Sequence, residues 1–200
     1  MRSVQAAPGT PLSPAELPVR KRRVAVLASV AAVVLALDAI SKALVVAHLT
    51  PDQPVHVLGD VLMLWLTRNP GAAWSIGTGE TAVFTVIAFG VVVYIARTAR
   101  RLYSLGWAVA LGLLVGGAAG NLGDRIFRSP GLFRGEVVDW IAVTRYYPIF
   151  NLADSAICCG GILTVILAMR GYHLNGTRGE VPAGTGQAGP GQTSTEQAEL

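Results

Sequence analysis

The chain has 200 residues, of which 52% are hydrophobic and only 14% are charged, and its mean hydropathy is +0.51. Soluble domains carry about 25% charged residues, so this composition favours a protein whose solvent is lipid. The net charge of +4 does not indicate nucleic-acid binding, because the basic residues flank long apolar segments and no aromatic-basic patch accompanies them.

The chain begins with a polar segment followed by a long apolar one. Residues 1–19 are rich in Pro, Ala and Ser, and they predict a disordered cytoplasmic tail. Four basic residues at 20–23 then precede an apolar segment at about 24–49. This segment is too long for the hydrophobic part of a cleaved signal peptide, and no small-residue cleavage site ends it. We therefore predict an uncleaved first membrane span with its N-terminus in the cytoplasm.

Three further spans are predicted at about 82–96, 102–120 and 149–169. The turn 97–101 contains three arginines and Arg170 follows the last span, which indicates that both lie on the cytoplasmic side. Four arginines in the outer loop 124–148 oppose this topology, and we follow the alternation of the other basic clusters instead. The prediction is one four-span membrane domain over 20–170 and a disordered cytoplasmic tail over 171–200.

The first outer loop has the pattern of a small β element. Apolar segments at 55–57 and 61–66 flank Gly59 and Asp60, a pair typical of a hairpin turn. The predicted fold class is therefore an all-α membrane protein with four transmembrane helices and a small β element on its outer surface. The only cysteines, Cys158 and Cys159, are adjacent within an apolar segment and predict packing residues, not a disulfide framework.

The first span contains an acid and a base, which are costly in lipid and so indicate a function. Asp38 and Lys42 are four residues apart and share one helical face. We interpret them as a self-neutralising pair that supports a site, with the lysine extending toward the outer surface. Ser41 cannot bond to Lys42, because helical neighbours point about 100° apart. Ser75 or Ser155 could meet Lys42 in space, which leaves a Ser–Lys peptidase as an alternative.

Polar residues also crowd the end of the third predicted span. Asp124 fits a helix end that meets water, and we interpret it as support for a site. Arg125 lies one turn after Asn121 and is suited to fixing a carboxylate or a loop carbonyl.

Two aspartates are predicted at the same depth on the outer side. Asp139 lies in a short apolar stretch of the outer loop, and Asp154 lies one turn into the last span, where Asn151 can cap the helix. Two carboxylates that lie close together share a proton, because both cannot ionise cheaply. The ionised member can activate water, and the protonated member can polarise a carbonyl and protonate the leaving amine. The pair therefore suits peptide hydrolysis.

Other kinds of function fit the sequence less well. His48, His56 and His173 form no ligand-spaced cluster, so we expect no metal and no other cofactor. A presenilin-like protease is disfavoured because the sequence before Asp124 lacks the first glycine of the Gly-x-Gly-Asp signature. A small transporter or channel subunit would place polar residues along whole spans and could show an internal repeat, whereas the second and fourth spans are almost wholly apolar and the two halves show no repeat.

Five motifs, in this order, resemble those of the bacterial lipoprotein signal peptidases (signal peptidase II). They are Asp38-x-x-x-Lys42, NPGAAWS at 69–75, GAAGNLGDR at 117–125, VVDW at 137–140 and FNLADS at 150–155. Each motif is weak alone, but five in order are specific. The chain departs from the family at Pro70, where a small or hydroxyl residue is expected, and at Trp74 and Trp140, where phenylalanine is commoner.

The resemblance implies a multi-pass enzyme of the bacterial inner membrane, with a β-cradle on the outer side and Asp139 and Asp154 as its catalytic dyad. It implies that the substrate is a prolipoprotein whose lipobox cysteine carries diacylglycerol, with cleavage just before that cysteine. We expect a monomer whose other partner is membrane lipid. Substrate-binding or supporting roles are implied for Asn69, Asn121, Arg125, Asn151, Asp38 and Lys42.

Overall fold

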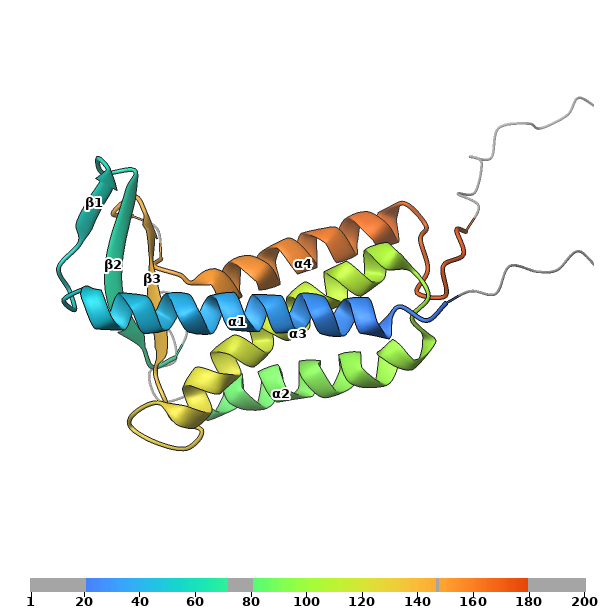
Figure 1. Cartoon of the computed structure of the whole chain (residues 1–200), viewed down its shortest axis with the longest axis horizontal. Coiled ribbons are helices and arrows are strands. Elements are labelled where there is room, and N and C mark those ends of the chain that lie inside the picture. The colour runs from blue at the N-terminus through green and yellow to red at the C-terminus, as the bar shows by residue number, and fades with distance from the viewer. Residues whose placement is uncertain (1–20, 72–80, 147, 180–200) are drawn as a thin grey trace, which may run out of the picture.

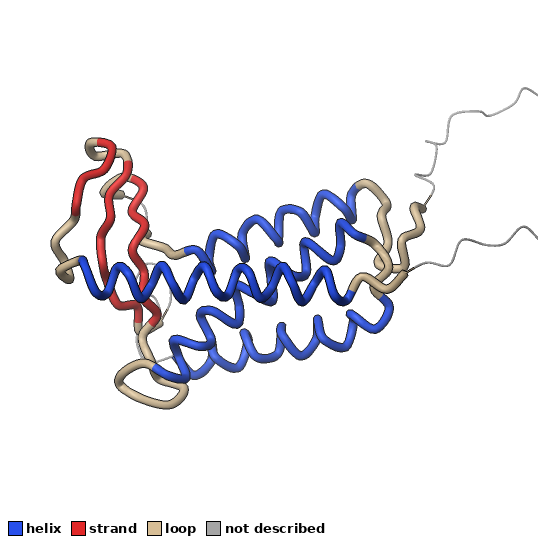
Figure 2. Tube along the Cα trace, viewed as in Figure 1, coloured by secondary structure: helices blue, strands red, loops and turns tan. Residues whose placement is uncertain are grey.

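A helical bundle carries a small sheet at one end (Figures 1 and 2). The computed structural model describes residues 21–71, 81–146 and 148–179, so the tail expected at 1–19 lies outside them. Within these residues, α1, α3 and α4 are long and apolar enough to cross a membrane. The helices are α1 (Val24–His48), α2 (Thr81–Thr98), the short 3-10 helix η2 (Ala99–Arg101), α3 (Leu105–Phe127) and α4 (Leu152–Met169).

Helix α3 lies at the centre and packs against each of the other three long helices. Three glycines on its α1-facing side, Gly112, Gly116 and Gly120, allow a close approach between the helices. A Cβ atom on Gly116 would lie 2.7 Å from Cβ of Val34, and one on Gly120 would lie 2.6 Å from Oδ2 of Asp38. Small residues at such positions let two backbones come together in a membrane. The polar face of α1 can therefore reach the site between α3 and α4.

The third and fourth helices differ from their predicted limits. Helix α3 continues to Phe127 instead of ending near residue 120, because its polar residues find buried partners and do not have to meet water. Asp124 is 7% exposed within this helix, so its assignment to a solvated helix end was wrong. Helix α4 begins at Leu152 instead of residue 149, because Phe150 is still extended and pairs with Ile141.

The sheet is antiparallel, in the order β1-β2-β3, with β1 (Val55–Leu58), β2 (Leu62–Asn69) and β3 (Val137–Val143). The predicted hairpin is confirmed, and Gly59 in its turn has the positive φ of +53° that favours glycine. Strand β3 was not predicted. Its register pairs Val137 with Asn69 and Asp139 with Thr67, so the end of β2 lies beside Asp139.

The segment after α4 folds back onto the other end of the bundle. The carbonyl of Leu174 accepts the backbone N–H groups of Tyr103 and Ser104 over 2.8 and 3.1 Å. The indole of Trp107 donates to the carbonyl of Tyr172 over 2.9 Å. These bonds satisfy donors at the start of α3, which has no side-chain cap. Residues 171–179, which the sequence assigned to a disordered tail, therefore belong to the folded domain, and 180–200 lie outside the described residues.

Candidate active site

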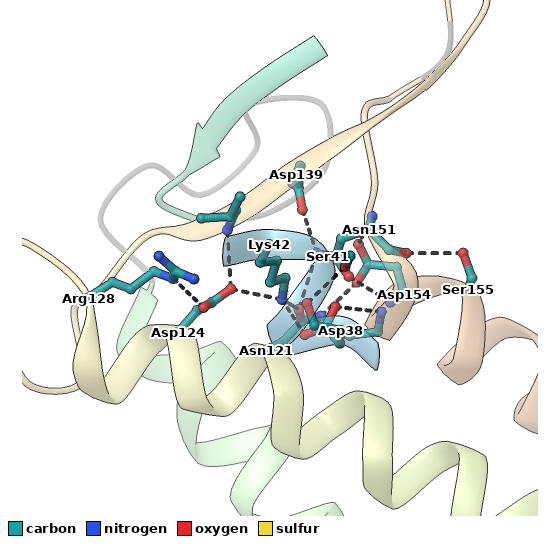
Figure 3. Close-up of polar contacts among 12 residues, drawn as sticks. Asp38, Ser41, Lys42, Asn121, Asp124, Arg128, Asp139, Asn151, Asp154 and Ser155 are labelled. Carbon is teal, nitrogen blue, oxygen red and sulfur yellow. Dashed lines mark hydrogen bonds and ion pairs between the residues drawn. The ribbon is translucent and has the colours of Figure 1, made fainter. Parts of the chain in front are cut away.

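Asp139 on β3 and Asp154 in the first turn of α4 line the same cavity, which has a volume of about 380 Å³. Asp139 and Asp154, which line the cavity, lie where the sheet meets the bundle (Figure 3). Asn69, Asn121 and Arg125, which the sequence assigned to supporting roles, also line it. Residues from β2, α3, β3 and α4 thus meet around the two carboxylates.

Asn151 bonds to both aspartates. Its side-chain N–H donates to Oδ1 of Asp139 over 2.6 Å. As the N-cap of α4, it accepts the backbone N–H of Asp154 at 2.9 Å and donates its own backbone N–H to Oδ2 of Asp154 at 3.2 Å. The capping role predicted from the sequence is confirmed. A completely buried asparagine thereby ties a strand residue to a helix residue.

Two other asparagines complete the bonding of the carboxylates. Asn69 donates its side-chain N–H to Oδ2 of Asp139 over 3.0 Å, and Asn121 donates to Oδ1 of Asp154 over 2.7 Å. Each of the four carboxylate oxygens therefore accepts an N–H group. These amides are neutral, so they orient the acids without adding charge to the cavity.

The two aspartates occupy different electrostatic environments. Asp139 is 2% exposed, and burial raises the pKa of its carboxyl from 3.8 to about 7. The negative charge of Asp154 also raises the pKa of Asp139, while the hydrogen bonds from Asn69 and Asn151 oppose the rise. Asp154 lies at the N-terminus of α4, where the helix dipole favours a negative charge. Near neutral pH, Asp139 is therefore suited to hold a proton.

Lys42 on α1 is 1% exposed. Its ammonium is 2.7 Å from Asp38 and 2.8 Å from Asp124, and it donates to Oδ1 of Asn121 over 3.1 Å (Figure 3). The predicted pair with Asp38 is confirmed. The expectation that Lys42 extends toward the surface was wrong, because two buried carboxylates compete successfully with water for its charge.

Arg125 does what its position suggested, since it donates to the backbone carbonyl of Gly71 over 3.1 Å. Gly71 in turn donates its N–H to Oδ1 of Asn69 over 3.0 Å. Sequence reasoning missed Gly71, because a backbone acceptor leaves no signal in residue type. These bonds connect α3 to the end of β2 at the wall of the cavity.

The contacts of Lys42 do not support a Ser–Lys site. A lysine that serves as a general base has to be neutral, whereas Lys42 sits between two carboxylates. Ser155 donates its hydroxyl to the carbonyl of Asn151 over 3.0 Å. Ser75 lies outside the described residues.

The fold and the site define a class: a multi-pass membrane protein with a pair of buried, amide-bonded carboxylates beside its small sheet. The sequence profile described as "Signal peptidase (SPase) II" matches residues 30–170, and the chain belongs to this family. Membership of a peptidase family favours hydrolysis over the transporter or channel alternative.

Relatives and a solved structure agree with the family. The lipoprotein signal peptidase of Streptomyces griseus is 57% identical over 157 residues, covering 78% of this chain and 80% of that protein. That of Rhodococcus jostii is 49% identical, covering 80% and 81%. A solved structure described as a bacterial membrane enzyme, determined by the in meso method at 2.3 Å resolution, has a TM-score of 0.67 and 30% identity, covering 75% of this chain and 91% of that chain.

Proposed function

We propose that this chain is an aspartic endopeptidase that removes signal peptides from prolipoproteins. Cleavage falls just before a lipobox cysteine that carries diacylglycerol, and Asp139 and Asp154 form the catalytic dyad. The observation that carries the proposal is that both carboxylates line one cavity and bond to the same asparagine, Asn151. The substrate class follows from the relatives, which are named lipoprotein signal peptidases.

The different environments of the two acids suggest their roles. Asp154, ionised, takes a proton from a water molecule as the water oxygen attacks the scissile carbonyl carbon. Asp139, protonated, gives its proton to the carbonyl oxygen, which forms a tetrahedral diol. The diol then collapses as the C–N bond breaks: the proton on Asp154 passes to the leaving amino group of the cysteine, and one hydroxyl proton of the diol returns to Asp139, which restores the dyad. The products are a signal peptide with a new carboxylate and a lipidated protein with a free amino terminus.

The surrounding residues hold these groups in place. Asn69 and Asn151 orient Asp139, while Asn121 and the start of α4 orient Asp154. Arg125 fixes the wall of the cavity through Gly71. Correct orientation of this kind lowers the barrier because the reacting groups need little rearrangement.

We further propose that α2 is the fourth span, so that one membrane domain carries the site on the extracytoplasmic side of the bacterial inner membrane. The start of α1 and the end of α4 lie at the end of the bundle opposite the sheet (Figure 1), which supports cytoplasmic termini. Basic residues gather at that end, including Arg23, Arg100 and Arg170. The sheet then acts as a cradle for the peptide, and one copy of the chain suffices for the site.

The proposal is tested by hydrolysis of a lipobox peptide whose cysteine carries diacylglycerol, compared with the same peptide without lipid. The purified protein should cut the lipidated peptide, and Asp139→Asn and Asp154→Asn should each abolish cutting without loss of the folded state. Ser155→Ala is the matched control, because it removes a hydroxyl from the same turn of α4, and it should cut normally. Near wild-type turnover in either aspartate variant would remove that residue from the dyad.

A further inference from the structure

Two acids outside the cavity bond to the backbone beside the dyad. Oδ1 of Asp38 on α1 accepts the N–H of Ala153, the residue before Asp154, over 3.0 Å. Oδ2 of Asp124 on α3 accepts the N–H of Val138, the residue before Asp139, over 3.2 Å. The two contacts have the same form, although they join different pairs of elements. Each acid therefore holds the backbone that carries one member of the dyad.

Lys42 joins these two acids. Its ammonium lies within 2.8 Å of a carboxylate oxygen on both Asp38 and Asp124, and the side chains are almost fully buried. Lys42 is not among the residues that line the cavity of the dyad. It therefore contacts the supports of the dyad without facing the space where a substrate would bind.

The third contact of Lys42 fixes the orientation of an amide. Oδ1 of Asn121 accepts from Lys42 at 3.1 Å and from the side chain of Asn151 at 3.2 Å. An ammonium can only donate, so the oxygen of Asn121 has to face Lys42. The N–H groups of Asn121 then face Asp154, to which they donate over 2.7 Å. If the amide of Asn121 were reversed, its N–H groups would face the ammonium of Lys42 and the side-chain N–H of Asn151, which are both donors.

We propose that Lys42 is the positioning residue of the dyad: through Asp38 and Asp124 it holds the backbone before each catalytic aspartate, and through Asn121 it fixes the donor that faces Asp154. This inference rests on the proposed function of Asp139 and Asp154. Lys42 acts through other residues and takes no part in bond making. Its loss should therefore lower turnover and leave substrate affinity nearly unchanged.

Lys42→Met tests the role directly, with hydrolysis of the lipidated lipobox peptide as the assay. A misplacement of about 1 Å costs about 100-fold in rate, so we expect kcat to fall by about 100-fold while KM stays within about twofold. Lys42→Arg keeps a cation that can bridge two acids and should restore part of kcat. Ser41→Ala is the matched control on the same turn of α1: it removes only a bond to the carbonyl of Asp38 and should leave kcat unchanged.

The pH profile separates positioning from simple structural support. The charge of Lys42 lowers the pKa of Asp139, so the alkaline limb of the Lys42→Met profile should move to higher pH. Loss of stability alone would lower the melting temperature but leave the profile and the kcat of the folded fraction unchanged, and that result would overturn the inference.

Lys42→Met leaves two buried carboxylates without their cation and can prevent folding. In that case Asp124→Asn provides the test, because it removes the ion pair between Lys42 and Asp124 and leaves the ion pair between Lys42 and Asp38. It should lower kcat with unchanged KM, and wild-type kcat would overturn the inference. Activity in Asp139→Asn or Asp154→Asn would instead overturn the proposed function, so the two failures are distinguishable.

Discussion

The side-chain amide of Asn151 donates to the carboxylate of Asp139 over 2.6 Å, the shortest of the bonds that hold this acid. Asn151 is also the N-cap of α4, so the same residue starts the helix and binds the acid on the neighbouring strand. The position of β3 relative to α4 is thereby set at the dyad itself. The residue that caps α4 therefore also helps to set the geometry of the site.

Replacement of Asn151 should separate these two roles. Asn151→Ala removes the cap, at a cost of about 1 kcal/mol in stability, and also removes the donor to Asp139. Asn151→Ser keeps a capping hydroxyl, but its shorter side chain cannot reach Asp139. We expect both variants to lose at least about 100-fold in kcat, whereas Asn151→Ala should lose more melting temperature than Asn151→Ser because it also loses the cap. Restored activity in Asn151→Ser would show that the bond to Asp139 is dispensable.

The pH dependence of hydrolysis should report the proton on Asp139. With a pKa of about 7, the protonated form is lost as the pH rises through neutrality, so kcat/KM should fall on that alkaline side. Asn69 donates to the charged form and lowers this pKa. Asn69→Ala should therefore move the alkaline limb to higher pH.

For Asn69→Ala, the informative quantity is the pH at which kcat/KM falls on the alkaline side, and not the maximal value of kcat/KM. Asn69 also accepts the N–H of Gly71, so its loss should lower the overall rate as well. Arg145→Gln is a suitable control, since it removes an exposed charge from the sheet region and should leave the limb in place. A limb that stays in place or moves to lower pH in Asn69→Ala would contradict the assignment of the proton.

Asp139 should also make stability depend on pH. Its folded pKa of about 7 exceeds the ordinary value of 3.8, so its favourable contribution is complete below about 3.8 and is lost as the pH rises through about 7. At pH 8 the fold holds a buried charge near Asp154. Asp139→Asn should therefore melt at a higher temperature than the wild type at pH 8, with a smaller difference at pH 5.

Thermal unfolding in detergent at the two pH values measures this effect. Asp60→Asn serves as the control, because that side chain is 71% exposed and its removal should change the melting temperature little. If the melting temperatures of Asp139→Asn and the wild type differed by the same amount at pH 5 and pH 8, Asp139 would be ionised throughout this range.

Local patterns predicted the parts of the fold that depend on neighbouring residues. The turn at Gly59 and Asp60 specified its hairpin, and the spacing of Asp38 and Lys42 specified their ion pair. Strand β3 gave no such signal. Its side chains are largely buried on both faces, so it lacks the alternation that marks a half-buried strand.

The sequence predicted which residues form the site, but it did not predict which of them bond to one another. Family motifs pointed to Asp139, Asp154 and their asparagines, yet the bond from Asp124 to Lys42 joins residues far apart in the sequence. That bond is also why α3 extends beyond its predicted end: polar residues with distant buried partners do not have to leave the helix. No pattern within α3 contains this information.

The proposed topology can be tested by cysteine labelling after replacement of Cys158 and Cys159 with serine. Arg134→Cys lies in the exposed loop after α3, and Arg100→Cys lies in the exposed turn at the other end of the bundle. A membrane-impermeant maleimide added to intact cells should label Arg134→Cys, and it should label Arg100→Cys only after permeabilisation. The reverse pattern would place the dyad on the cytoplasmic side.

The close contact between α1 and α3 should link packing to activity. A Cβ atom at position 116 would meet Cβ of Val34 at 2.7 Å and the carbonyl of Ala31 at 2.8 Å, so α1 would have to shift. Gly116→Ala should therefore cost about 1–3 kcal/mol in stability. It should also lower kcat, since α1 carries Lys42. Gly123→Ala lies on the same helix with nothing within 4 Å, and it should stabilise α3 by up to about 1 kcal/mol without loss of turnover. Equal effects of the two substitutions on melting temperature and kcat would show that the spacing of α1 and α3 does not control the site.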